Sequence, residues 1–137
     1  MAQAFVITLD KDLPEAAAYT KAGTGKALFR ESSKLDFASR RKGVPALNSM
    51  LSESQAALIA QLQADGFEPS KMRLPPERWY PAADGLKTVR GLIEDVTAHL
   101  NDFKQPNPIL RDLRAAEVLL AAAETAGVKF HFTNANL

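Results

Sequence analysis

Residues 79–103 have the sequence WYPAADGLKTVRGLIEDVTAHLNDF and predict the central helix of the protein. Apolar residues recur in this stretch at alternating steps of three and four, which places them along one side of an α-helix. They are Leu86, Val89, Ile93, Val96, Leu100 and Phe103, and Leu92 widens the stripe. Polar residues fall off the stripe: Lys87, Arg90, Glu94, Asp95, Thr97 and Asn101. We therefore expect a helix with one buried face and one solvated face.

The chain after the central helix predicts a second helix and a strand. Asn107 and Pro108 are typical of a helix start, because proline is tolerated in the first turn. Its expected buried stripe is Ile109, Leu113, Ala116, Leu120 and Ala123, and Gly127 ends it. Residues 128–132, VKFHF, alternate strictly, with Val128, Phe130 and Phe132 on one face and Lys129 and His131 on the other. This pattern predicts a half-buried strand.

The first half of the chain predicts one strand and several shorter helices. Residues 4–9, AFVITL, favour a strand, and residues 12–15 then favour a helix that continues to Gly23. A second helix is expected at about 26–41, with Gly43 as its stop and with Phe29 and Phe37 facing the core. The capping box at 52–55 predicts a further helix, which has Leu58, Ile59 and Leu62 on its apolar side and ends at Gly66. Four prolines in 67–81 predict a long irregular connection.

Together these elements predict one helix-rich α+β domain that spans residues 1–137. A ribbon of two strands is marginal alone, so the terminal strands are expected to pair and to pack as a small sheet on the hairpin of the last two helices. The expected core is Phe5, Ile7, Leu86, Val89, Ile93, Val96, Leu100, Leu113, Leu120, Phe130 and Phe132.

Composition restricts the compartment and the chemistry. The chain has 137 residues, 46% of them hydrophobic, a formal net charge of +1 and no cysteine. The absence of cysteine excludes disulfides and thiolate chemistry and suits a reducing compartment. Neither a signal peptide nor an apolar run long enough to span a membrane is evident, so we expect a cytoplasmic protein that does not insert into membranes.

Signatures of catalysis, cofactors and metals are weak. Residues 22–27, AGTGKA, resemble a phosphate loop, but Thr20 and Ala27 stand where a glycine and a hydroxyl residue are needed. A helix stop followed by a turn is the simpler interpretation. His99 and His131, the only histidines, cannot close a zinc site by themselves. We therefore predict no cofactor and no metal, and we favour a protein that is not an enzyme. An enzyme that uses His131 or a carboxylate of the central helix stays as a third alternative.

Binding is the leading hypothesis. Arg73, Arg78, Trp79 and Tyr80 cluster in or beside the proline-rich connection, and these residue types often anchor interfaces. We expect a small protein-binding or regulatory module, in the manner of an immunity protein. Its partner is another protein, which meets the arginine end of the cluster, while the aromatic end is structural.

The alternative partner is a nucleic acid or a phosphate ligand. Basic residues dominate positions 21–42, and a looser anion site would use Gly25 and Lys26 at a helix N-terminus together with Arg40 and Arg41. The pI of 8.0 is low for a nucleic-acid-binding domain, so this alternative ranks second.

The second half of the chain resembles small uncharacterised bacterial proteins. The resemblance is carried by Trp79-Tyr80, by residues 85–90 (GLKTVR) and by residues 128–132, with support from residues 43–47 (GVPAL). It covers about the last sixty residues and consists of helix packing, not of chemistry. It implies a bacterial cytoplasmic protein and assigns no activity and no catalytic residue.

Overall fold

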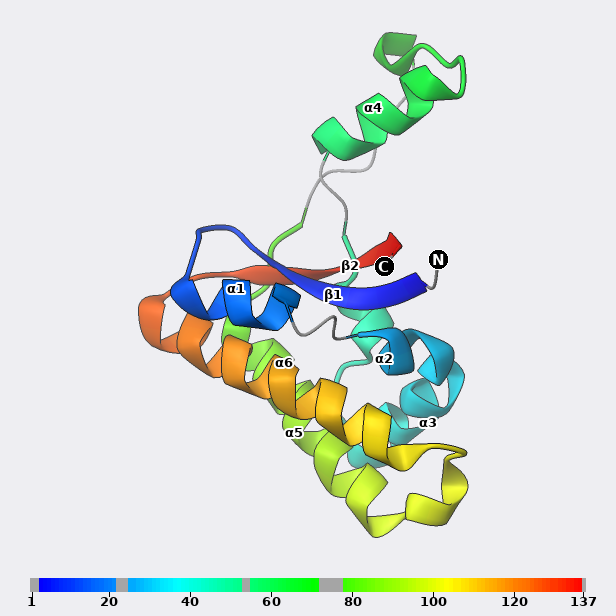
Figure 1. The fold of residues 1–137 in the computed structure, drawn as a ribbon, viewed down its shortest axis with the longest axis vertical. Helices are drawn as coiled ribbons and strands as arrows, with labels where there is room; N and C mark the ends of the chain where they lie inside the picture. Colours follow the sequence, from blue (N-terminus) through cyan, green and yellow to red (C-terminus); the bar gives the residue numbers. More distant parts are fainter. Residues whose placement is uncertain (1–2, 22–24, 53–54, 72–77, 137) are drawn as a thin grey trace.

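The sheet consists of the two ends of the chain. The computed structural model describes residues 3–21, 25–52, 55–71 and 78–136. The elements are β1 (Gln3–Leu9), α1 (Pro14–Lys21), α2 (Lys26–Arg30), α3 (Ser32–Lys42), η1 (Leu47–Met50), α4 (Gln55–Ala64), η2 (Pro69–Lys71), α5 (Ala82–Ala98), η3 (Leu100–Asp102), α6 (Pro106–Ala126) and β2 (Phe130–Asn136). β1 and β2 pair antiparallel in an unbroken register from Gln3–Asn136 to Leu9–Phe130. The two termini consequently lie side by side (Figure 1).

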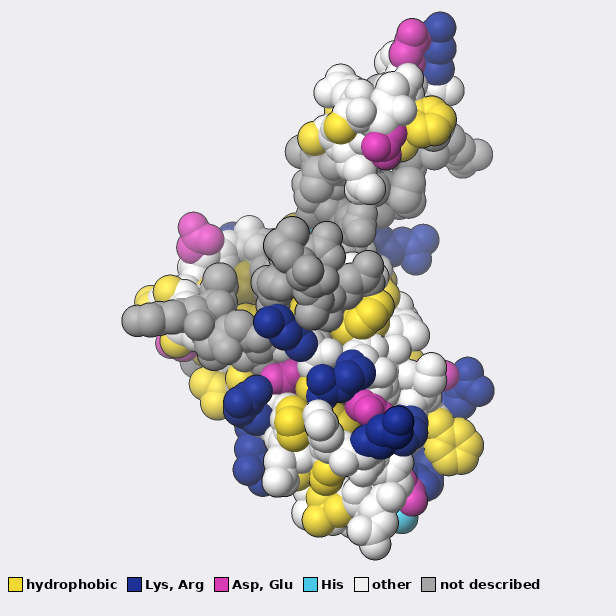
Figure 2. All heavy atoms as spheres, turned by 45° about the vertical axis from the view of Figure 1, so that its right-hand side comes forward, with side chains coloured by type: hydrophobic (Ala, Val, Ile, Leu, Met, Phe, Trp, Pro, Cys, Tyr) yellow, Lys and Arg dark blue, Asp and Glu magenta, His cyan; other side chains and the backbone are white. Residues whose placement is uncertain are grey.

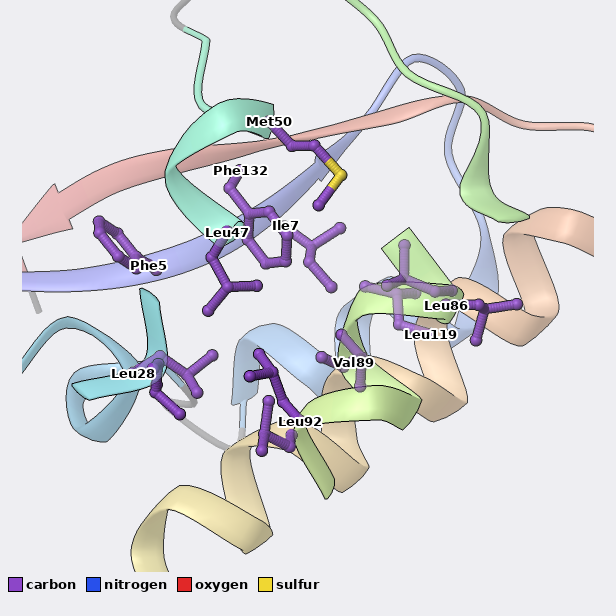
Figure 3. Packing of buried hydrophobic residues seen from close by; sticks show 14 of the residues in the cluster. Phe5, Ile7, Leu28, Leu47, Met50, Leu86, Val89, Leu92, Leu119 and Phe132 are labelled. Carbon is purple, nitrogen blue, oxygen red and sulfur yellow. The ribbon is translucent and has the colours of Figure 1, made fainter. Parts of the chain in front are cut away.

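The inner face of the sheet packs on the hairpin of α5 and α6, as expected. Phe5, Ile7, Phe130 and Phe132 share this face and are buried. Figure 3 shows Ile7 and Phe132 meeting Met50 and Leu47 of η1, above residues of α5 and α6. The predicted helix-rich α+β class is therefore confirmed.

The outer edge of β1 is closed by the segment that carries α1 and α2. Phe5 donates its backbone N–H to the carbonyl of Gly25 at 3.1 Å, and Ile7 donates its own to the hydroxyl oxygen of Tyr19 at 3.3 Å. Burial raises the pKa of the Tyr19 hydroxyl above its ordinary value, so this group stays protonated. Both donors would otherwise form an open strand edge, which is a site of aggregation.

A buried acid of α6 fixes the start of α2. Asp112 accepts the backbone N–H of Ala27 at 3.0 Å and is almost fully buried. Burial raises the pKa of this carboxyl, and the hydrogen bonds from Gly25 and Ala27 oppose that rise. Gly25 itself has a φ of +116° and lies against the backbone of Phe5. The glycine is required there because any Cβ would collide with β1.

The buried stripe of α5 is close to the prediction but differs in three residues. Leu86, Val89, Leu92 and Val96 are buried, whereas Ile93 is only half-buried. Leu100 was expected in the core and is 44% exposed, because α5 ends at Ala98 and the tighter η3 turns Leu100 off the stripe. Asp95 was expected on the solvated side and is only 3% exposed. Its carboxylate accepts two hydrogen bonds from the Arg41 guanidinium of α3, with Nε at 2.9 Å from Oδ1.

Other boundaries also differ from the prediction. The helix expected at 26–41 breaks at Glu31 into α2 and α3, so Phe29 and Phe37 do not share a face. Phe29 is half-buried, and its ring centroid lies 5.3 Å from that of Phe5. Phe37 is 64% exposed, which contradicts the expected core position. α6 begins at Pro106, not at Asn107. β2 runs from 130 to 136, not from 128 to 132, because pairing with β1 decides its length and the polar residues 133–136 follow the partner strand.

The position of Leu100 gives a simple test of this packing. We expect Leu100→Ala to lower the free energy of unfolding by less than about 1 kcal/mol, since much of the side chain is already in water. Leu113→Ala is the matched control on α6, where the leucine is fully buried and its truncation costs about 2–5 kcal/mol. Urea unfolding followed by circular dichroism measures both. Equal losses would place Leu100 in the core.

Candidate functional site

Two segments of the chain meet on the edge of β2 that lies opposite β1. Ser52 donates its backbone N–H to the carbonyl of Phe132 at 2.9 Å. On the same edge, Tyr80 and Phe130 exchange two backbone hydrogen bonds of 2.8 and 2.9 Å. The segments are joined to each other, because Arg78 donates its backbone N–H to the hydroxyl of Ser52 at 2.8 Å. We call residues 51–52 and 78–80 the neck.

The neck carries an arm, residues 53–77, of which 55–71 are described. Figure 1 shows α4 standing away from the sheet and from the other helices. Among the described residues, the main contacts of α4 are with η2. Gly66 ends the helix as predicted, with a φ of +87°, and Phe67 donates its N–H back to the carbonyl of Leu62 at 2.9 Å. The helix predicted after the capping box at 52–55 therefore belongs to a projection.

The helix of the arm, α4, is uncharged, and the exposed Asp65 directly follows it. The sequence of α4, QAALIAQLQA, contains no acidic or basic residue. Ile59 and Leu62 are half-buried, and the ring of Phe67 is 55% exposed. The charges near the tip include Glu68 and Lys71, which pair with each other at 3.0 Å. Figure 2 shows acidic and basic side chains on the arm as well as on the body.

The outer face of the sheet is polar and is covered at the neck. The Trp79 ring lies on the His131 ring, with 4.4 Å between their centroids, and leaves His131 only 1% exposed. His131 Nδ1 lies 3.1 Å from the hydroxyl of Thr133, which in turn donates to the carbonyl of Ser52 at 3.3 Å. His131 was expected on the solvated face of its strand. It is buried because Trp79 covers it, and the tryptophan thereby fixes the neck to β2.

The structure brings together three of the four residues predicted to bind a partner. Arg78, Trp79 and Tyr80 are consecutive in the neck, and Arg73 lies outside the described residues. Trp79 and Tyr80 are half-buried, and Tyr80 packs on the core. The side chain of Arg78 is exposed, and the hydrogen bond to Ser52 uses the backbone N–H of Arg78. Whether any of these residues contacts a partner stays a prediction.

Trp79 and Arg78 are a matched pair for testing the neck. We expect Trp79→Ala to lower the free energy of unfolding by about 1–3 kcal/mol, because a half-buried aromatic ring loses its contact with His131. Arg78→Ala keeps the backbone N–H and should change stability by less than about 0.5 kcal/mol. Thermal melts with the same buffer measure both. A larger loss for Arg78→Ala would contradict this assignment.

The residues proposed for an anion are already engaged with acids or near them. Gly25 and Lys26 begin α2, whose N-terminal amides point at the Asp112 carboxylate. Arg40 pairs with Asp36 at 3.0 Å, and Arg41 holds Asp95. Lys34 and Lys42 of the same segment pair with Glu31 and Glu94, at 3.8 and 3.1 Å. A phosphate ligand would have to compete with these carboxylates for Arg40 and Arg41, and with Asp112 for the amides that begin α2.

Phe37 and Arg41 line a hollow on the body. It has a volume of about 390 Å³ and lies between α3 and the segment after α5, with Ser33, Lys34, Asp102 and Phe103 as its other lining residues. The Arg41 guanidinium lies 5.6 Å from the Phe37 ring centroid and 3.8 Å from the Asp102 carboxylate. The residues that line this hollow belong to other segments of the chain than the neck. Both cations of the lining face acids, Arg41 with Asp95 and Asp102 and Lys34 with Glu31.

Within the described ranges no three acidic or histidine side chains gather as metal ligands would. His99 Nδ1 lies 3.0 Å from the carbonyl of Asp95, so this histidine sits at the C-terminal end of α5. No described helix is long and apolar enough to cross a membrane.

Sequence reasoning missed the arm and two buried acids, although each had a signal. Asp95 lies three residues after Leu92, and Asp112 lies three residues after Ile109, so both acids occupy core positions of their stripes. The signal for the arm was ten successive uncharged residues in α4 without a clear polar face. Such a helix does not have the solvated side that a helix on the surface of a core requires.

The fold and the site define a helix-rich α+β domain that carries a projecting helical arm on a neck hydrogen-bonded to β2. Comparison with protein-family models, with curated proteins and with solved structures gives no match to the chain.

Proposed function

We propose that this chain is a protein-binding module and that the arm is the element that binds. One observation carries the proposal. α4 has only ten residues and, among the described residues, makes its main contacts with η2. Isolated helices shorter than about 12–15 residues are marginal in water, and helices in proteins owe most of their stability to packing. A partner that covers α4 would supply that packing.

The chemistry of the arm favours an apolar partner surface. Ile59 and Leu62 of α4 are half-buried, and the ring of Phe67 after the helix is exposed. Apolar side chains on a short helical element suit an apolar groove, which is a recurrent mode of recognition between proteins. A nucleic acid would require unpaired cations, and α4 has none. The binding element proposed here is therefore the arm that the neck holds, and Arg78 stays a rim residue at its base.

The neck suits such a role because it limits the cost of binding. The two segments of the neck that flank the arm are hydrogen-bonded to β2 and to each other. Arms that are held at both ends lose less orientational freedom on binding than free tails do. A cytoplasmic location and a regulatory role, for example inhibition of a partner enzyme, agree with this arrangement and belong to the proposal.

The test uses a photo-crosslinking amino acid in cells that express the full chain. We expect crosslinks from Gln63, which is exposed on α4, and none from Lys87, which is exposed on α5. Mass spectrometry identifies the crosslinked protein, which is then purified and titrated against the chain. The Phe67→Ser variant should bind it at least about tenfold more weakly, because an exposed aromatic ring loses its burial in the complex.

Phe37→Ser is the matched control, since Phe37 is an equally exposed phenylalanine on the body. It should leave the affinity unchanged. Equal crosslinking from Gln63 and Lys87, or equal losses from the two phenylalanine variants, would show that the arm is not the binding element.

A further inference from the structure

We infer that the hollow beside α3 binds a small organic cation with a flat apolar body, such as an aromatic amine or amidine. The hollow has a volume of about 390 Å³ and is lined by two phenylalanines and by charged side chains. Binding sites for small ligands combine mostly apolar walls with a few polar groups in volumes of roughly 300–1,000 Å³. The lining residues belong to other segments than the arm, so this inference is independent of the proposed function.

The first support is the charge balance around Arg41. Its guanidinium donates two hydrogen bonds to the Asp95 carboxylate, and its Nη1 lies 3.8 Å from the Asp102 carboxylate. One cation between two anions leaves an excess of one negative charge. Asp95 is only 3% exposed, whereas the side chain of Asp102 is 57% exposed. A ligand therefore meets the excess negative charge at Asp102, and a cation complements it.

Two other charged or titratable groups lie in this region. Lys34, the second cation of the lining, lies 3.8 Å from Glu31, so that pair has no net charge. His99 Nδ1 lies 3.6 Å from Asp95 Oδ1, and this ring adds a positive charge only when it is protonated. The hollow consequently favours a cation most clearly at a pH where histidine side chains are neutral.

The second support is the aromatic wall. The side chain of Phe37 is 64% exposed in the hollow, where a bound apolar group would cover part of it. The Arg41 guanidinium lies 5.6 Å from the centroid of this ring, so the ring already holds one cation. Phe103 is buried and forms another part of the wall. A flat organic cation gains apolar contact and a cation–π attraction at the same ring.

The third support is the geometry at Asp102. The distance of 3.8 Å to Arg41 is longer than a hydrogen bond, so this contact leaves the Asp102 oxygens able to accept N–H donors from a ligand. Arg41 does not follow the ligand, because Asp95 holds its guanidinium through two hydrogen bonds. An amidinium presents two parallel N–H donors, which is the arrangement that a carboxylate accepts best.

The test compares three probes of nearly the same shape: benzamidinium, benzamide and benzoate, which are cationic, neutral and anionic. Each is titrated into the full chain at low salt and about pH 8, where histidine side chains are ordinarily neutral. Chemical shifts of the backbone amides of residues 33–41 and 99–103 report binding. We expect benzamidinium to bind at least about fivefold more tightly than benzamide, because an exposed ion pair and a cation–π contact both favour it. Benzoate should bind most weakly.

Two variants separate the charge from the aromatic wall. Asp102→Asn should lower the affinity for benzamidinium to that for benzamide and leave benzamide unchanged. Phe37→Ala should weaken both probes at least about threefold, since both lose the ring. Glu124→Gln is the matched control, because it removes one negative charge from an exposed position on α6. It should leave all three affinities unchanged. Circular dichroism confirms that each variant is folded.

Three results would overturn the inference. If about 10 mM benzamidinium shifts none of these amides, the hollow has no useful affinity for a cation. Equal affinities for the three probes would show that the hollow does not select by charge. A preference for benzamidinium that survives Asp102→Asn would show that Asp102 does not provide the selection. Crosslinking from Gln63 tests the arm separately, so each of these results leaves the proposed function standing.

Discussion

Gly25→Ala should destabilise the protein by about 3 kcal/mol or more. A Cβ at this position would lie 2.1 Å from the carbonyl oxygen of Phe5 and 2.9 Å from its carbonyl carbon. Both are backbone atoms of β1, so no side-chain rotation can relieve the collision. The φ of +116° adds strain for any residue with a side chain. Relief requires moving α2 away from β1, which breaks the bond from Phe5 N–H to the Gly25 carbonyl.

The Gly43→Ala variant measures the cost of backbone strain without a steric collision. Gly43 also has a positive φ, of +68°, but a Cβ there would meet open space. Its substitution should cost only about 1–2 kcal/mol, the preference for glycine in a left-handed conformation. Urea titrations of the two variants measure both values. If Gly25→Ala lowers the free energy of unfolding no more than Gly43→Ala does, α2 does not approach β1 as closely as described.

Phe130→Ala should cost about 3–5 kcal/mol. The ring is fully buried, packs edge-on to Phe132 with 5.4 Å between centroids, and fills the niche over Gly85. A Cβ at Gly85 would lie 2.5 Å from the tip of this ring, so the Phe130 ring fits only because residue 85 has no side chain. Truncation of the ring leaves a cavity between β2 and the α5–α6 hairpin.

A double-mutant cycle checks that explanation. Gly85→Ala should be strongly destabilising in the natural background and much less so beside Phe130→Ala, because the truncated ring leaves room for the new methyl group. Phe37→Ala is the control for loss of a phenylalanine at an exposed site and should change stability by less than about 0.5 kcal/mol. Independent effects of the two substitutions at 85 and 130 would contradict the contact.

The pairing of the terminal strands and their packing on α5 and α6 could be predicted because their patterns are strong. Alternation in β2 and the stripe of α6 report directly which face is buried. The extent of β2 could not be predicted, since Asn134 and Asn136 have weak strand preferences and their conformation comes from pairing with β1. The break between α2 and α3 at Glu31 could not be predicted either, because local preference favours one continuous helix there.

The candidate site was predictable only in part. The composition of residues 78–80 pointed to the neck, but periodicity cannot say which surface an apolar helix packs against. For that reason the helix could be predicted from the sequence, but its position in a projecting arm could not. The cover of Trp79 over His131 is likewise a contact between residues far apart in the chain.

The register of the sheet also sets the order in which the chain can fold during synthesis. β1 leaves the ribosome first, but its partner β2 follows roughly 120 residues later, which takes roughly 6–24 s at typical elongation rates of 5–20 residues per second. The α5–α6 hairpin involves neighbours in sequence and can form early, whereas the sheet must close a very long loop. Throughout that interval the Phe5–Ile7 face has no strand beside it. Nascent chains of this protein should therefore expose an apolar strand that chaperones at the ribosome can bind.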